Sequence, residues 1–287
     1  MAVNKKTIQR RIKSVRNTRK ITKAMELVAA AKMRRATSAV AKTRPYANLA
    51  WQTVRAIMRQ AVDVAHPLMV APKNAARTLL VLYASDRGLA GGYNVNMMRK
   101  AVTFVAEHGA ANVDIIAVGR RAESIAKSGA TILASFHGLT NQPQLKDMLP
   151  IIRLLVDTFA KGQHKGVYLG YTDFISGMTQ TPKISLLIPL VPREDKKNEE
   201  GTNYTFEPNA RDVLDRVLPG IIETKIFHAL LEAAASEHAA RMMAMRNATE
   251  SATEMLDDLT FTYNQARQAA ITQEIAELVS GTAAISK

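Results

Sequence analysis

Residues 3–58 have the sequence VNKKTIQRRIKSVRNTRKITKAMELVAAAKMRRATSAVAKTRPYANLAWQTVRAIM. The stretch contains no glycine, and strong helix formers such as alanine, lysine and arginine dominate it. Apolar residues recur at helical spacing, for example Ile8, Ile12 and Val15. We therefore expect one helix of about 55 residues, roughly 80 Å long, which is too long to be buried in a compact domain. Its single proline, Pro45, predicts a kink.

A second long helical pattern runs from about residue 209 to 279. Its apolar positions include Ile222, Ile226 and Leu230, and Pro219 predicts a bend near its start. Periodic helices of this length favour a coiled coil over a globular core. We expect the N- and C-terminal helices to pair antiparallel.

The middle of the chain alternates short β-branched runs with helical ones. The expected strands are Thr78–Tyr83, Val113–Val118, Thr131–Phe136, Gly166–Thr172 and Lys183–Leu190. The expected helices are Asn94–Glu107, Arg120–Ser128 and Gln144–Lys161. This alternation predicts a mostly parallel sheet covered by helices, followed by a polar loop over 192–208 that ends in a short strand.

The expected fold class is therefore α/β with long helices: an antiparallel coiled coil of the N- and C-terminal helices plus a central Rossmann-like α/β domain. The corresponding division of the chain is 1–60, 61–208 and 209–287. Its 287 residues are 47% hydrophobic, which excludes a disordered chain. There is no cysteine, which excludes a disulfide scaffold, a thiol nucleophile and cysteine-ligated zinc.

The net charge of +14 is concentrated at the N-terminus. Residues 1–60 contain 16 lysines and arginines and one acid, Glu26, whereas the rest of the chain is close to neutral. The basic arm predicts an acidic partner surface. A coiled-coil protein that binds nucleic acid is the alternative, although the arm has no aromatic residue before Tyr46 with which to stack bases.

The most enzyme-like stretch is SDRGLAGGYN at residues 85–94, which follows an expected strand. Its glycine spacing matches neither phosphate-binding fingerprint, so we expect a structural turn in which Asp86 and Arg87 bond locally. None of the six histidines has metal-site spacing, and we find no nucleophile with a plausible base. We expect no catalytic, cofactor or metal site, with a Rossmann-like enzyme as a lesser alternative.

The chain also lacks a membrane signal. It has no apolar run of about 18 residues, and its first residues lack the apolar core of a secretory signal. We expect the start to be mature sequence and the protein to be soluble on the cytoplasmic side.

Two blocks carry a family resemblance: ITKAMELVAAAKMRR at residues 21–35 and ITQEIAELVSGTAA at residues 271–284. Further matches are SDRGLAGGYN, EAAASEHAARMMAMRNATESA at 232–252 and YNQARQA at 263–269. Together these segments resemble the gamma subunit of the bacterial F-type ATP synthase over the whole chain.

The resemblance implies a non-catalytic rotor subunit of the central stalk, peripheral on the cytoplasmic face of the bacterial plasma membrane. It would couple rotation of the c-subunit ring to ATP synthesis or hydrolysis at the beta subunits and contribute to regulation of ATPase activity and proton flow. The implied partners are the alpha, beta and epsilon subunits and the c ring. Neither nucleic acid nor a cofactor is implied, and contact with the membrane is indirect.

The resemblance also points to particular residues. Those implied to contact alpha and beta subunits and to couple rotation are Met25, Lys32, Arg241, Arg267, Gln268, Thr272 and Glu274. Arg267 and Gln268 match a pair that hydrogen-bonds to a beta-subunit loop, and Met25 is expected near Arg241 and an acidic beta loop. Tyr204 and Glu207 match the region that touches epsilon and the c ring.

Overall fold

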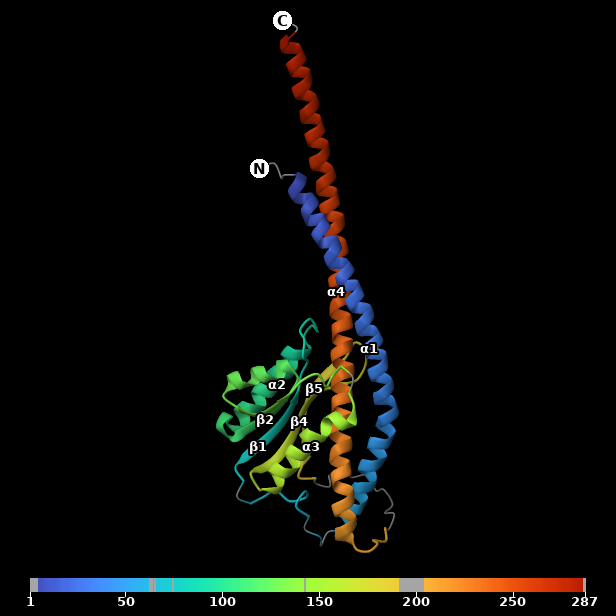
Figure 1. The fold of residues 1–287 in the computed structure, drawn as a ribbon, viewed down its shortest axis with the longest axis vertical. Coiled ribbons are helices and arrows are strands. Elements are labelled where there is room, and N and C mark those ends of the chain that lie inside the picture. The colour runs from blue at the N-terminus through green and yellow to red at the C-terminus, as the bar shows by residue number, and fades with distance from the viewer. Residues whose placement is uncertain are drawn as a thin grey trace. The chain divides into compact units, whose positions relative to one another are not determined.

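The computed structural model describes residues 5–61, 64, 66–73, 75–141, 143–190 and 204–285. The chain divides into two compact units. The sheet unit is Ala29–Arg241, and the terminal unit is Met1–Val28 together with Met242–Lys287. Each unit contains part of both long helices, α1 (Lys5–Gln60) and α4 (Ala210–Ile285), which Figure 1 shows in blue and in orange to red.

Five strands form one sheet in the order β3-β2-β1-β4-β5. Their bounds are β1 Arg77–Tyr83, β2 Val113–Val118, β3 Thr131–Phe136, β4 His164–Phe174 and β5 Gln180–Ile188. β1 pairs in parallel with β2 and β4, β2 pairs in parallel with β3, and β4 pairs antiparallel with β5. The predicted mostly parallel sheet is confirmed.

Helices cover both faces of this sheet. Because side chains along β1 alternate between the two faces, their contacts show which helices lie on which face. Leu80 and Leu82 pack in one cluster with α2 (Tyr93–His108) and the 3₁₀ helix η2 (Arg120–Ser128). Leu79, Val81 and Tyr83 point to the other face, into the cluster shared by α3 (Leu145–Ala160), α1 and α4. The larger core therefore joins the sheet to the long helices. A short 3₁₀ helix, η1 (Ala110–Asn112), precedes β2.

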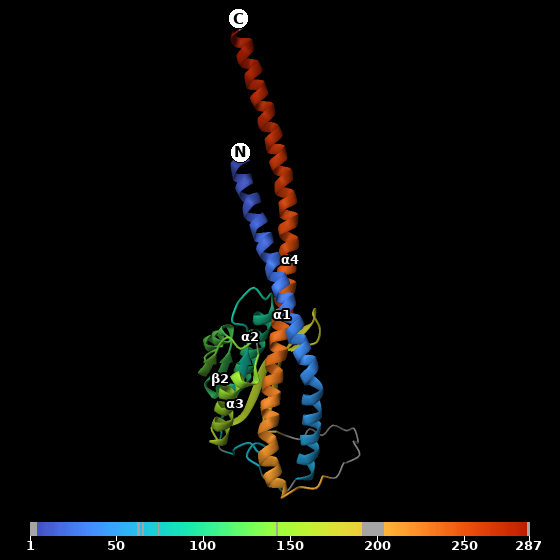
Figure 2. The ribbon, with the colours of Figure 1, turned by 45° about the vertical axis from the view of Figure 1, so that its right-hand side comes forward.

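The two long helices run antiparallel in each unit. In the sheet unit Ala36 and Val40 of α1 pack with Leu231 and Ala235 of α4, and Figure 2 shows the two helices side by side there. In the terminal unit Thr22 pairs with Thr249, and Gln9 with Tyr263. Partner numbers fall along α4 as they rise along α1, so the predicted antiparallel pairing is confirmed within each unit.

Several local predictions differ from the structure. Residues 120–128 are helical with the predicted bounds, in the form of a 3₁₀ helix. β5 begins at Gln180 rather than Lys183, because backbone pairing with β4 incorporates the polar residues Gln180–Pro182, which carry no apolar signal. Residues 204–208 contain no strand, and residues 192–203 of that predicted loop lie outside the described residues.

The long helices lie close to their predicted ranges of 3–58 and about 209–279, but α1 ends at Gln60 and α4 continues to Ile285. Both helices continue through their prolines, Pro45 and Pro219. The boundaries between the two compact units, however, fall inside the long helices, after Val28 in α1 and after Arg241 in α4. The division into 1–60, 61–208 and 209–287 therefore remains a proposal about how the chain works.

Candidate functional site

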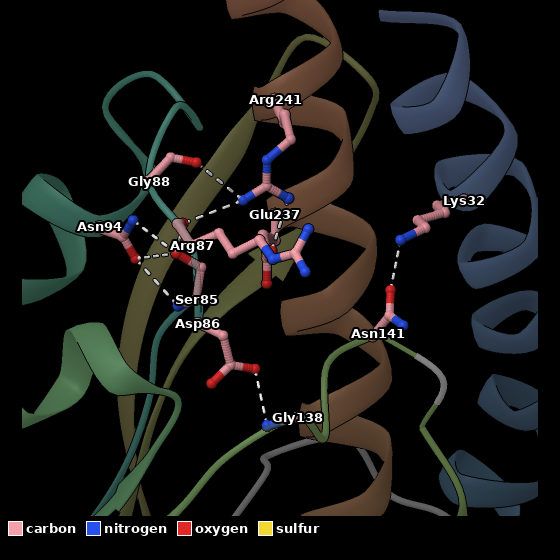
Figure 3. Close-up of polar contacts among 10 residues, drawn as sticks. All are labelled: Lys32, Ser85, Asp86, Arg87, Gly88, Asn94, Gly138, Asn141, Glu237 and Arg241. Carbon is pink, nitrogen blue, oxygen red and sulfur yellow. Dashed lines mark hydrogen bonds and ion pairs between the residues drawn. The ribbon is translucent and has the colours of Figure 1, made fainter. Parts of the chain in front are cut away.

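The loops that follow β1, β2 and β3 meet at one edge of the sheet, because parallel strands end on the same side. Asp86 joins all three: its carboxylate accepts hydrogen bonds from the backbone N–H of Gly138 at 2.9 Å and of Arg120 at 3.2 Å. Figure 3 shows the first of these bonds. The expectation that Asp86 bonds locally is therefore wrong, since its partners lie 34 and 52 residues further along the chain.

A close backbone approach makes this junction possible. Gly119 has φ +92°, and a Cβ there would lie 2.1 Å from the carbonyl oxygen of Ala84. Only glycine therefore fits at this position. The N–H of Gly119 instead donates to the carbonyl of Phe136 at 2.7 Å, which ties the ends of β2 and β3 together.

The glycine-rich loop after β1 is closed by its own side chains. The Ser85 hydroxyl donates to the carbonyl of Arg87 at 2.6 Å, and the Ser85 N–H donates to the Asn94 side chain at 3.0 Å. At the outer side of the loop, Leu89 has φ +60° and is 65% exposed. A non-glycine residue rarely adopts this conformation, so the surrounding loop must hold the backbone of Leu89 in place and its apolar side chain at the surface.

Arg241 of α4 clamps this loop (Figure 3). One terminal nitrogen, Nη1, lies 2.7 Å from the Glu237 carboxylate, and the other, Nη2, donates to the carbonyls of Arg87 and Gly88, each at 3.2 Å. Both charged side chains are nearly buried, which strengthens their attraction. The loop turns its carbonyl oxygens, rather than its N–H groups, toward this cation, an arrangement suited to attachment on α4 and not to holding phosphate.

A second attachment involves Lys32 of α1, whose ammonium donates to the side chain of Asn141 in the loop after β3. Next to it, His238 of α4 is buried. Burial, with the positive charges of Arg241 and Lys32, lowers the pKa of His238 to about 4. The imidazole is therefore neutral at physiological pH, and it adds no third positive charge beside Arg241 and Lys32.

A buried ionic group also joins α1 to α4 in the sheet unit. The Glu232 carboxylate accepts a hydrogen bond from Arg44 at 2.9 Å and lies 3.2 Å from His228. Burial alone would raise the pKa of Glu232, but its bonds to His228 and Arg44 outweigh that effect and lower it. The two helices are therefore joined by specific contacts in addition to apolar packing.

In the terminal unit, the predicted site residues of α4 lie on exposed helix surface: Arg267, Gln268, Thr272 and Glu274. Within the part of the chain that the structure describes, the Thr272 hydroxyl donates to the backbone carbonyl of Gln268 in its own helix. An apolar stripe lies among them, formed by Ile271, Ile275, Leu278 and Val279, and these side chains are between 45 and 72% exposed. A stripe at this spacing normally packs against another surface.

The remaining predicted residues have different surroundings. Met25 is half-buried in α1 and belongs to the terminal unit, whereas Arg241 belongs to the sheet unit, so their expected proximity stays a prediction. Tyr204 is half-buried against the larger core, and its backbone N–H donates to the Gln60 side chain at 2.9 Å. Glu207 is exposed.

Sequence reasoning missed the roles of Glu237 and Leu89. Glu237 precedes Arg241 by four residues on a helix, a spacing that favours an ion pair and was available as a signal. The exposed left-handed conformation of Leu89 carries no sequence signal, because leucine rarely adopts it.

Two kinds of feature are absent from the described residues. These residues contain no group of three or more His, Cys, Asp or Glu side chains placed to hold a metal ion. None of the helices in those ranges is long and apolar enough to cross a membrane.

Comparisons with known sequences match nearly the whole chain. The family model described as ATP synthase matches residues 4–285. The ATP synthase gamma chain of Xanthomonas axonopodis pv. citri is 38% identical over 281 residues, covering 97% of this chain and 98% of that protein. The ATP synthase gamma chain of Legionella pneumophila is 37% identical over 286 residues, covering 98% and 99%.

Solved structures share the fold at lower identity. A chain from the Euglena gracilis mitochondrial ATP synthase rotor has a TM-score of 0.64 at 18% identity, covering 93% of this chain and 98% of that chain. A chain from the Tetrahymena thermophila mitochondrial ATP synthase central stalk and c ring has a TM-score of 0.61 at 22% identity. It covers 79% of this chain and 99% of that chain.

Proposed function

The chain belongs to the ATP synthase gamma-chain family, and on that premise we propose that it is the central-stalk rotor subunit of a proton-translocating F-type ATP synthase. One observation carries the proposal: the match to curated gamma chains extends over 97% of this chain at 38% identity. The match therefore includes both terminal helices, which in this role contact the alpha and beta subunits. No feature of the described residues favours the nucleic-acid alternative.

In this role the chain performs no chemistry itself. Rotation of the c ring turns the sheet unit and both long helices, and the helices bias the conformations of the beta subunits, which hold the catalytic sites. Such a bias requires contacts that differ among the three beta subunits, because a ligand shifts a conformational equilibrium only by its differential affinity. The same contacts let the chain contribute to regulation of ATPase activity and proton flow.

The exposed end of α4 supports this assignment on physical grounds. Ile271, Ile275, Leu278 and Val279 form a stripe that the described residues leave exposed to solvent, and alpha and beta subunits would cover it. Arg267 and Gln268, together with Thr272 and Glu274, project polar groups beside it. Isolated surface ion pairs contribute about 0–1 kcal/mol each, so polar contacts there guide rotation without trapping it.

At the other end of the assembly, we assign Tyr204 and Glu207 to contacts with epsilon and the c ring. The backbone N–H of Tyr204 is hydrogen-bonded to the Gln60 side chain, which holds this segment in place. Glu207 is exposed three residues further on, so its carboxylate is available to a partner. The chain would thus be peripheral on the cytoplasmic face of a bacterial plasma membrane and reach the bilayer only through its partners.

Met25 offers a direct test of rotation. In Met25→Lys, we expect the ATP synthase to assemble, but proton pumping per ATP hydrolysed should fall, because a new ion pair with an acidic beta loop would favour one rotary state. Inverted membrane vesicles carrying the variant complex would report pumping by a pH-sensitive dye and hydrolysis by released phosphate.

Met178→Lys is the matched control, since Met178 is 83% exposed in the turn between β4 and β5. It adds the same charge and should leave the pumping ratio unchanged. An unchanged ratio in Met25→Lys would refute the role given to Met25. Failure of the purified chain to assemble with alpha and beta subunits would refute the rotor assignment itself.

A further inference from the structure

A groove of about 530 Å³ lies between α1 and α4 in the terminal unit. Its α1 side is formed by Arg19, Lys20, Lys23, Ala24 and Leu27. Most of the groove surface is apolar, because the long side chains contribute their carbon stems. Small-molecule sites usually have volumes of about 300–1,000 Å³ and mostly apolar walls, so this groove has the size and the character of such a site.

The α4 side of the groove, formed by Thr249 and Thr253, requires no polar partner. The hydroxyl oxygens of Thr249 and Thr22 lie 2.8 Å apart, and the Thr253 hydroxyl donates to the carbonyl of Thr249 at 2.9 Å. Both threonines therefore satisfy their hydroxyl groups within the terminal unit. Covering them with an apolar group costs no hydrogen bond, which favours an apolar occupant on this side.

The positive charge of the groove is concentrated at one end. On α1, Arg19 and Lys20 come first, and Ala24 and Leu27 follow on the next two turns. Arg19 and Leu27 are eight residues apart, which corresponds to about 12 Å along a helix. Leu27 is 60% exposed. The groove is therefore basic at one end and apolar, with its leucine open to water, at the other.

The cations at the basic end lack a counter-charge. Lys23 is paired with Glu26, whose carboxylate lies 3.0 Å from its ammonium. Arg19 and Lys20, by contrast, have no acidic partner in the part of the chain that the structure describes. An anion bound between these two side chains would form charge-assisted hydrogen bonds without displacing an internal ion pair.

We propose that this groove binds a free long-chain carboxylic acid, with the carboxylate between Arg19 and Lys20 and the acyl chain along Ala24 toward Leu27. The carboxylate supplies the missing counter-charge, and the acyl chain removes the apolar end of the groove from water. A small inorganic anion would leave that apolar end exposed, and an uncharged lipid would leave the two cations unpaired. The inference concerns the free chain and is independent of the proposed rotor function.

Calorimetric titration of dodecanoate into the purified full-length chain, below the concentration at which dodecanoate forms micelles, tests the proposal. We expect saturable binding of one molecule per chain. The affinity should fall by up to about fourfold for each methylene removed between dodecanoate and octanoate, because less apolar surface is then buried. Acetate and dodecyl maltoside should each bind at least tenfold more weakly than dodecanoate, because the first lacks the acyl chain and the second lacks the charge.

The double variant Arg19→Gln with Lys20→Gln removes the two unpaired cations and should weaken dodecanoate binding at least tenfold. Arg99→Gln with Lys100→Gln is the matched control, since these adjacent residues are exposed on α2 and the net charge falls by the same amount. It should bind dodecanoate as the unaltered chain does. Unchanged binding in the first double variant, or equal weakening in the control, overturns the proposal.

Methyl NMR of the unaltered chain locates the ligand, and it decides the question if circular dichroism shows that a variant fails to fold. Thr253 lies one turn beyond the contact of Thr249 with Thr22, toward the level of Arg19, because the helices run antiparallel. A nitroxide on carbon 12 of dodecanoate should therefore broaden the methyl resonances of Leu27 more than that of Thr253. The reverse order, or no broadening of either residue, overturns the proposal.

Discussion

The two halves of α4 differ sharply although they form one helix. Within the sheet unit, its apolar side chains at Leu218, Ile222, Ile226 and Leu230 are completely buried. Within the terminal unit, the stripe from Ile271 to Val279 is largely exposed. Both stretches have helical apolar spacing, so periodicity alone does not distinguish a surface that this chain covers from one that it leaves open.

The difference indicates where each half obtains its stability. The first half packs against the sheet, α3 and α1, and it carries the buried contacts of Glu232 and Arg241. The second half has hydroxyl and amide contacts to α1 at Thr249 and Tyr263, and beyond them most of the side chains up to residue 282 are exposed. One half serves as a fixed base, and the other is a surface for partners under the proposed function.

Truncation of one isoleucine in each half gives the largest expected contrast. Ile226 is 0% exposed, and Ile226→Ala should lower the free energy of unfolding by about 2–5 kcal/mol through lost burial and a residual cavity. Ile275 is 56% exposed, and Ile275→Ala should change it by less than about 0.5 kcal/mol. Urea denaturation of the purified chains measures both values.

Assembly should reverse this order. Ile275→Ala removes part of the exposed stripe. The affinity of the variant chain for alpha and beta subunits should therefore fall, although the chain folds normally. Equal destabilisation by the two substitutions would show that the C-terminal stripe is covered within the free chain, and the contrast between the halves would be lost.

Two arginines of α4 sharpen the comparison. Arg241→Ala leaves the buried Glu237 carboxylate without its cation and should cost about 3–4 kcal/mol of stability, measured by urea denaturation. Adding Glu237→Gln should recover part of this loss, because the uncompensated charge is removed. Arg267→Ala, at an exposed position, should leave the stability of the free chain unchanged. Loss of stability in Arg267→Ala would place that residue in an internal contact.

Much of the fold follows from local pattern. The strands Val113–Val118 and Thr131–Phe136 have the predicted bounds because each is a short run rich in β-branched and apolar residues between turns. The long helices are predictable because the helical pattern of apolar residues continues over a long stretch at each end of the chain, with no glycine over residues 3–58. Their antiparallel pairing follows because both ends of the chain carry such a helix.

The attachment at the sheet edge could be predicted only in part. The pair Glu237 and Arg241 has a helical spacing that sequence shows, but their link to the carbonyls of residues 87 and 88 depends on tertiary packing. Asp86 likewise bonds to residues far along the chain, which no local rule anticipates. The conformation of Leu89 results from the loops around it and contradicts the preference of leucine itself.

His238 gives the fixed half a pH dependence. Its pKa is about 4 in the folded chain and near 6.5 when unfolded, so the unfolded state binds the proton first as pH falls. The free energy of unfolding should therefore decrease between pH 6.5 and 4, by an amount on the order of 3 kcal/mol. His238→Gln removes the titrating group, so the difference between the two chains in urea midpoints should shrink as pH falls. A constant difference over that range would mean that His238 is protonated equally easily in both states.

The smallest expected effect lies in the terminal unit. The Thr249 hydroxyl donates to the Thr22 hydroxyl at 2.8 Å, and Thr22 donates to the carbonyl of Arg19. A single neutral hydrogen bond contributes about 0.5–1.5 kcal/mol. Thr22→Val and Thr249→Val should therefore show a coupling of that size in a double-mutant cycle.

Amide hydrogen exchange near both positions in the full-length chain measures this coupling locally, where global unfolding is not informative. Thr262→Val is the control, because the Thr262 hydroxyl donates to the carbonyl of Asp258 in its own helix and to no group of α1 among the described residues. It should show no coupling to Thr22. If Thr249 shows none either, the helices separate readily at this point in the free chain, and the terminal half of α4 depends even more strongly on partner subunits than its exposed stripe indicates.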